Sequence, residues 1–233
     1  MRNYIQLLLL IFLTNNLISQ TLDAGAYGSD GLFLFGITKT RPVPSMRVKG
    51  SMYYNKKFQP GYLRYYNKMM TEKSYMRYNA FTDEIEMASS EITDNSSIIV
   101  FKDRHIAPVF SGETYVYLPY RLDDGRAYIG YLIEIYNGDK FNLYLRRNKQ
   151  FMEEVKARTG MDNPFPPRYI DRMDFYISFN SGTPSILKPT KKRILSYFPN
   201  NQDEIRAFIK SYKLKVSEKE SIVRIFEFAE KLE

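Results

Sequence analysis

The chain has 233 residues, a formal net charge of +8, 20 tyrosines, 16 phenylalanines and no cysteine. The absence of cysteine excludes disulfides, thiolate metal sites and a cysteine nucleophile. A chain of this length can form one sizeable domain that buries its core without covalent cross-links.

The first residues have the pattern of a secretory signal peptide. Arg2 precedes an apolar run from Ile5 to Leu13, and polar residues follow from Thr14. This run is shorter than the roughly 20 residues that a membrane-spanning helix needs. We therefore expect a signal peptide over residues 1–19 and no transmembrane segment after its cleavage. The protein would then be exported to the periplasm, the outer membrane or the exterior.

The middle of the chain has the punctuation of a β-rich region. Residues 20–48, rich in Gly, Pro and small side chains, predict an extended lead-in, and Pro60-Gly61 predicts a chain reversal. Asp124-Gly125 and Asn137-Gly138 separate three alternating segments, which predicts two-residue hairpin turns with positive φ angles. The sequence NSGT, ending at Thr183, separates two further extended runs.

Helical periodicity begins after Pro189. A short helix is expected from Lys191 to Phe198, and a second helix with Asn201 as its N-cap. Ser217 and Glu220 have the spacing of a capping box for a third helix. The predicted buried positions of the last two helices are Ile205, Phe208, Ile209, Tyr212, Ile222, Ile225, Phe226, Ala229 and Leu232.

Together these elements predict an α+β fold. We expect an antiparallel, meander-type and curved β-sheet with two to three C-terminal α-helices packed on it. The helical tail is too short to bury a core of its own, which favours one domain over residues 49–233. Residues 49–188 would be its β-rich part and residues 190–232 its helical part.

The stretch RYNAFTDEIEM, from Arg77 to Met87, concentrates three carboxylates. Alternation along a strand would place Glu84 and Glu86 together on a solvated face. An exposed pair of Arg77 with Asp83 or Glu84 across a hairpin explains the stretch without catalysis. The alternative is an envelope-polymer hydrolase that uses Asp83, Glu84 or Glu86 as acid or base, although neighbouring residues of one strand rarely flank a scissile bond.

The positive charge is concentrated in one region. From Lys140 to Arg193 there are twelve Lys or Arg against five Asp or Glu, a net charge of +7. Such a field favours an anionic lipid, glycan or protein partner, while the absence of a nucleic-acid-binding motif argues against DNA or RNA. A basic surface that only keeps the protein soluble is the alternative. The candidate binding residues are Arg146, Arg147, Lys149, Lys191, Lys192 and Arg193.

His105 is the only histidine, so a histidine-based metal site is not expected. Ser111 does not have the sequence context of a hydrolase nucleophile. We predict no catalytic residue and no cofactor, and the sequence gives no indication of oligomeric state.

Two motifs resemble a group of secreted proteins of Bacteroidota with no assigned activity. The patterns are GSxYxxxxFxPG and RYNxxxDExE, and the resemblance extends over about Lys49 to Leu232. It implies an exported, single-domain envelope protein, and it supplies no catalytic or binding residue. The residues that carry it are Gly50, Ser51, Tyr53, Phe58, Pro60, Gly61, Arg77, Tyr78, Asn79, Asp83, Glu84 and Glu86.

Overall fold

The computed structural model describes residues 35–40, 48–70, 73–91, 96–156 and 164–232. The expected signal peptide and most of the lead-in lie outside these residues. The described strands are β1 (Phe35–Thr40), β2 (Gln59–Tyr65), β3 (Lys68–Met69), β4 (Ser74–Asn79), β5 (Glu84–Ala88), β6 (Ser96–Val100), β7 (Ile106–Phe110), β8 (Glu113–Arg121), β9 (Ala127–Asn137), β10 (Phe141–Met152), β11 (Arg168–Phe179) and β12 (Ser185–Leu187). The described helices are α2 (Lys191–Leu195), α3 (Gln202–Ser211) and α4 (Lys219–Leu232). None of the helices in these ranges is both long enough and apolar enough to cross a membrane.

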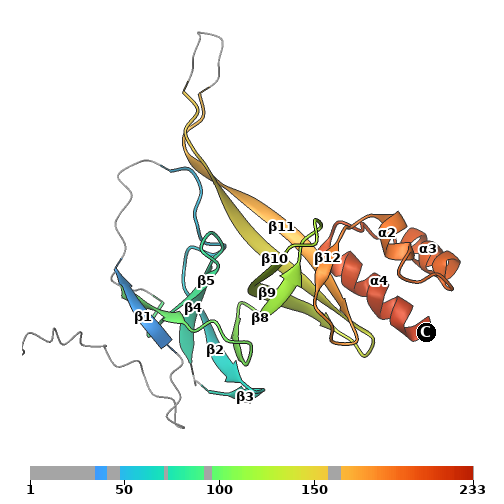
Figure 1. Cartoon of the computed structure of the whole chain (residues 1–233), viewed down its shortest axis with the longest axis horizontal. Helices are drawn as coiled ribbons and strands as arrows, with labels where there is room; N and C mark the ends of the chain where they lie inside the picture. Colours follow the sequence, from blue (N-terminus) through green and yellow to red (C-terminus); the bar gives the residue numbers. More distant parts are fainter. Residues whose placement is uncertain (1–34, 41–47, 71–72, 92–95, 157–163, 233) are drawn as a thin grey trace, which may run out of the picture.

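A mostly antiparallel sheet with C-terminal helices confirms the α+β class (Figure 1). The strand order is β1-β6-β5-β4-β2-β7-β8-β12-β11-β10-β9, and β8 also pairs with β9. From β8 to β12 each strand pairs antiparallel with the next one along the chain. A parallel pairing of Ser185 with Arg121 then joins β12 to β8, so these five strands form a closed ring of pairings.

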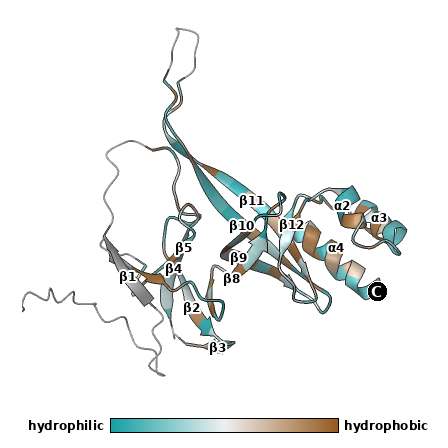
Figure 2. Cartoon of the chain, in the orientation of Figure 1, coloured by the Kyte–Doolittle hydropathy of each residue, from teal (hydrophilic) through white to brown (hydrophobic). Residues whose placement is uncertain are grey.

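Side chains from the two faces of these strands enter two apolar clusters, because successive residues of a strand point to opposite sides. One cluster contains Tyr120, Leu132, Tyr144 and Tyr176. The other runs from the N-terminal strands to the helices, whose apolar residues are coloured brown in Figure 2. Within it, the ring of Phe141 lies 5.1 Å from that of Phe226, measured between centroids. The helices are therefore attached to the sheet through a continuous core.

The helices follow the predicted periodicity with changes at their ends. The predicted positions on α4 are buried except for Leu232, which is 38% exposed. On α3, Ile205 and Ile209 are buried and Phe208 is partly buried, while Tyr212, just after the helix, is 57% exposed. Asn201 occupies the N-cap position of α3, but its side chain makes no capping hydrogen bond. The predicted capping box is wrong, because α4 begins at Lys219, two residues after Ser217.

Two of the predicted turns differ in their geometry. Gly125 has the expected positive φ, +82°, but the loop between paired Leu122 and Arg126 has three residues. Pro60 and Gly61 lie inside β2 and make no reversal. A Cβ on Gly61 would collide with the carbonyl oxygen of Val109 on β7, so this glycine permits close strand approach instead.

Asn137-Gly138 does begin the β9–β10 connection, although not as a two-residue turn with positive φ. β9 ends at Asn137 and β10 begins at Phe141. A Cβ on Gly138 would lie 2.5 Å from Oε2 of Glu230 on α4. That carboxylate accepts hydrogen bonds from the Lys140 N–H, at 2.9 Å, and from the Tyr136 hydroxyl. Gly138 therefore makes room for the contact that fixes α4 to this loop.

Candidate functional site

Residues of the two motifs form an ion pair on the N-terminal strands between the partly buried Arg77 and the fully buried Glu86. Arg77 of β4 contacts Oε2 of Glu86 on β5 through Nε and Nη2, both at 2.9 Å. The guanidinium lies between two aromatic rings, 3.9 Å from the centroid of Tyr53 and 4.2 Å from that of Phe58. Burial lowers the pKa of Arg77 to about 10, so it remains protonated at neutral pH. The Tyr53 hydroxyl also donates to Glu86, at 3.2 Å from Oε2.

The burial of Glu86 contradicts the expectation that Glu84 and Glu86 lie together on a solvated face of the strand. Glu86 is completely buried, and it is Glu86 that pairs with Arg77 rather than Asp83 or Glu84. The alternation of the strand is real, but the segment before β2, through Tyr53 and Phe58, covers the face that was expected to be solvated. Glu84 instead accepts a hydrogen bond from the Thr82 hydroxyl at 2.7 Å.

Asp83 holds the β4–β5 turn against the ring of strands. β9 and β10 pair only through Ile133–Asn137 and Asn142–Leu145, which leaves a split between the rest of the two strands. Asp83 accepts the Tyr131 N–H of β9 through Oδ2 at 3.2 Å and the Tyr78 hydroxyl through Oδ1 at 2.6 Å. Burial and the nearby Asp83 carboxylate raise the pKa of Tyr78. On the other side of the split, Ala80 accepts the Lys149 N–H of β10 at 2.9 Å.

The remaining motif residue shapes the turn itself. The Asn79 side chain accepts hydrogen bonds from the Phe81 and Thr82 N–H groups, both at 3.2 Å. Asp83 adopts a positive φ of 55° at the end of the turn. The three carboxylates of RYNAFTDEIEM thus differ in the hydrogen bonds described here, and each contributes to a structural contact.

The structure separates the six basic candidates. Arg147 makes a two-bond contact with Glu113, of which the Nη2–Oε1 distance is 2.7 Å, and it stacks on Tyr54. Burial opposes its charge, but Glu113 raises the pKa of Arg147. Lys149 pairs with Asp171. Arg146 lies on the opposite face of β10 from both, with its guanidinium 5.3 Å from the Tyr120 ring centroid.

The other three candidates form a short exposed run on α2. Lys191, Lys192 and Arg193 are all exposed, while the next two residues of the helix are buried. Within the described part of the chain, none of the three has a carboxylate partner. The Arg193 guanidinium lies 5.0 Å from the ring centroid of Tyr197. These three side chains are therefore available to solvent, unlike Arg147 and Lys149.

His105 lies in an exposed loop, where its Nδ1 is 3.0 Å from Oδ1 of Asp103 and its ring stacks on Tyr66. Ser111 contacts Asn55 rather than this histidine. No group of three potential metal ligands is found among the residues that the structure describes.

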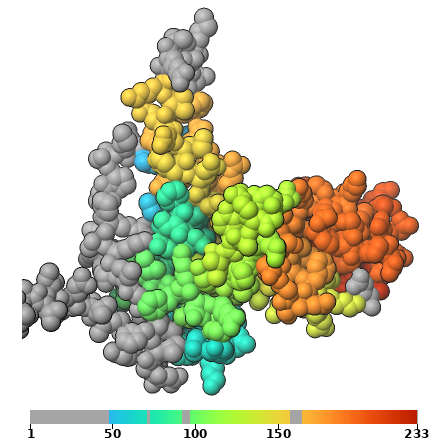
Figure 3. Space-filling view, in the orientation of Figure 1, coloured from blue at the N-terminus to red at the C-terminus, as the bar shows by residue number. Residues whose placement is uncertain are grey.

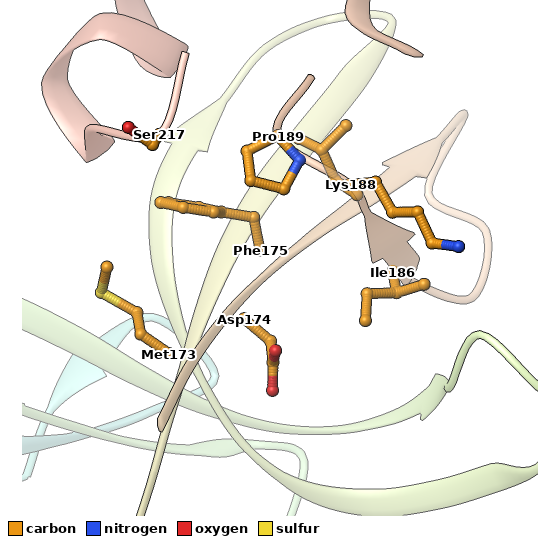
Figure 4. A pocket seen from close by; sticks show the side chains of 8 residues that line it. Met173, Asp174, Phe175, Ile186, Lys188, Pro189 and Ser217 are labelled. Carbon is orange, nitrogen blue, oxygen red and sulfur yellow. The ribbon is translucent and has the colours of Figure 1, made fainter. Parts of the chain in front are cut away.

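Sequence reasoning missed a cavity of about 340 Å³ beside β11. It is lined by β11, by β12 and the chain leaving it, and by Ser217 before α4 (Figure 4). No sequence signal pointed to it, because its walls come from three separate segments. The residues that line the cavity are Met173, Asp174, Phe175, Ile186, Leu187, Lys188, Pro189 and Ser217.

Sequence reasoning also missed the stacking of Arg77 on Tyr53 and Phe58, although the motif GSxYxxxxFxPG contains both aromatic residues.

The fold and these contacts define an α+β protein with a large antiparallel sheet and a C-terminal helical layer. Comparisons with protein-family models, with curated proteins and with solved structures found no match to the chain.

Proposed function

We propose that this protein is an exported, non-enzymatic binding or structural module of the cell envelope. It binds an anionic lipid, glycan or protein partner through a cationic surface on α2. The observation that carries the proposal is the exposed run of Lys191, Lys192 and Arg193. The signal-peptide pattern of residues 1–19 supports export, and the absence of cysteine is compatible with it.

The placement of these charges supports binding rather than folding as their role. α2 is only five residues long, and two of the three cations, Lys192 and Arg193, lie in its last turn. None of the three forms an ion pair within the described residues. A partner with negative charges would stabilise them. Figure 3 shows the helical region at one end of the molecule, where an extended surface can approach it.

The test is to measure binding of the purified protein to vesicles with and without an anionic phospholipid, and to an acidic polysaccharide. A basic residue near an anionic surface contributes about 1 kcal/mol. Replacing all three by glutamine should therefore weaken binding by about a hundredfold. High salt should also weaken binding, because the electrostatic screening length shortens to about 3 Å at 1 M salt.

The matched control replaces three scattered exposed lysines, Lys68, Lys102 and Lys210, by glutamine. This control has the same loss of net charge but leaves α2 intact. An equal loss of binding in both triple variants would show that net charge, and not the α2 surface, is responsible. Absence of binding to all of these anions would count against the proposal.

A further inference from the structure

The outer edge of β11 has a gap in its pairing. On one side, β11 pairs with β10 along its whole length, from Arg168 to Phe179. On the other side, β12 pairs only with Phe175–Ile177, and Lys49 bonds to the strand near Tyr169. Among the described residues, no strand pairs with the edge between Tyr169 and Phe175.

The direction of the backbone groups in this gap follows from alternation. The Tyr169 N–H donates to the Lys49 carbonyl oxygen at 3.0 Å, so it points away from β10. Groups of every second residue in an antiparallel strand point to the same side. The N–H groups of Asp171 and Met173 therefore also point outward, and both residues are exposed. They present donors in the spacing that an added strand requires.

The cavity lies where the missing strand would continue. It begins at Met173, Asp174 and Phe175 and ends at Leu187 and Lys188, where β12 stops. Figure 4 shows that Phe175 and Asp174 leave β11 in different directions, as alternation demands. Because residues from both faces of β11 line the cavity, the cavity lies beside the edge of this strand. A peptide segment that enters it can therefore hydrogen-bond to the part of the edge that has no pairing strand among the described residues.

The chemistry of the cavity favours a basic side chain. Its apolar walls include Phe175 and Pro189, which suit an aliphatic stem. Lys188 is paired with Asp123 at 2.7 Å. Asp174 has no ion-pair partner among the described residues, and the guanidinium of its cross-strand neighbour Arg146 lies over Tyr120. The carboxylate of Asp174 is thus the acidic group of the cavity wall, and it has no direct ion pair within the described residues.

We propose that an extended peptide segment of a partner protein adds to β11 as a strand and inserts a lysine or arginine side chain into this cavity. Main-chain hydrogen bonds to Asp171 and Met173 hold the segment, and the Asp174 carboxylate selects the basic residue. Strand addition to an exposed edge is a common mode of peptide recognition. This site is separate from the α2 surface, and its failure would leave the proposed function untouched.

The test uses the purified protein and an acetylated, amidated pentapeptide, Thr-Val-Lys-Val-Thr. Binding should slow the hydrogen exchange of the Asp171 and Met173 amides, as followed by nuclear magnetic resonance. A Met173→Pro variant removes one outward donor, and proline is tolerated at sheet edges. It should weaken binding about tenfold, while Met173→Thr, which keeps the donor, should remain within about twofold.

A charge variant keeps the test decisive if Met173→Pro does not fold. Asp174→Asn should weaken binding of the lysine peptide about tenfold and equalise it with a peptide carrying norleucine at that position. Equal binding of the lysine peptide to Met173→Pro and Met173→Thr, or no protection of the two amides, would overturn strand addition. Protection that appears without peptide as the protein concentration rises would assign the edge to a second copy and also overturn the proposal.

Discussion

The environment of Arg77 explains why an arginine occupies this position. Its planar guanidinium is stacked between Tyr53 and Phe58 and still directs two nitrogens to Glu86. A lysine ammonium could keep the charge but neither the stacking nor the planar two-nitrogen contact. Residues from both motifs thus combine into one structural unit that joins the segment before β2 to β4 and β5.

Removing the charge of Glu86 is expected to destabilise the protein strongly. Glu86→Gln leaves Arg77 without a carboxylate. Because the Arg77 side chain is 19% exposed and also donates to the Lys56 carbonyl oxygen, we expect a loss of about 2 to 3 kcal/mol, below that of a fully buried pair. Glu84→Gln is the matched control, since its carboxylate contacts an exposed hydroxyl, and it should cost less than about 1 kcal/mol. Urea unfolding measures both values. Similar small losses in the two variants would refute the structural role of the Arg77–Glu86 pair.

At the level of secondary-structure elements, polar contacts at loops add to the attachment that the apolar core provides. The β4–β5 turn enters the split between β9 and β10 through Asp83 and Ala80. A Cβ on Gly130 would lie 2.5 Å from Oδ2 of Asp83, so glycine is needed for this approach. A second polar contact involves Glu230, which fixes α4 to the β9–β10 loop. Each contact joins segments that are distant in sequence.

The Glu230 contact predicts a pH dependence of stability. Burial, which alone would raise the pKa of Glu230, is outweighed by hydrogen bonds from the Lys140 N–H and the Tyr136 hydroxyl, so this pKa lies below its ordinary 4.5. A carboxylate with a lowered pKa in the folded state stabilises the protein above its unfolded pKa, and this stabilisation is lost as the pH falls through the folded pKa.

Glu230→Gln should therefore be less stable than the wild type at neutral pH, and the difference should shrink as the pH falls from 4.5 through the lowered pKa of Glu230. The free energy of unfolding, measured at several pH values, gives this difference. Glu227→Gln on the exposed face of α4 should show no such dependence. A difference between wild type and Glu230→Gln that stays constant with pH would mean that the carboxylate charge is not involved.

For the whole molecule, one apolar cluster extends from Leu63 and Met76 through Tyr115 and Tyr131 to Ile222 and Phe226. The helices and the N-terminal strands therefore share core residues with the central strands. We expect a single cooperative unfolding transition, because neither end can lose its packing without exposing part of the common core.

This expectation is tested by following helix content through far-ultraviolet circular dichroism and tyrosine packing through the near-ultraviolet signal. The two should change at the same urea concentration. A separate, earlier loss of helix would show that the helical layer unfolds independently of the sheet.

Local features of the fold were predictable where they depend on nearby residues. The helical stripe of Ile222, Ile225, Phe226 and Ala229 is buried as periodicity indicated. The burial of Glu86 was not predictable. The alternation of side chains along β5 places Glu86 on one face of the strand, but it does not tell whether solvent or another segment covers that face. Likewise, Arg146 and Arg147 are adjacent in sequence but lie on opposite faces of β10, so a charge count could not identify a common surface.

The sequence by itself determined the strand-and-helix order, the places of several turns and the total charge, because these depend on residues close together in the chain. Only the tertiary structure decided that Glu86 is buried against Arg77, that the β4–β5 turn lies between β9 and β10, and that part of the β11 edge beside a cavity has no pairing strand among the described residues. These features depend on contacts between distant segments, and their geometry is set by how the strands pair and how the loops pack.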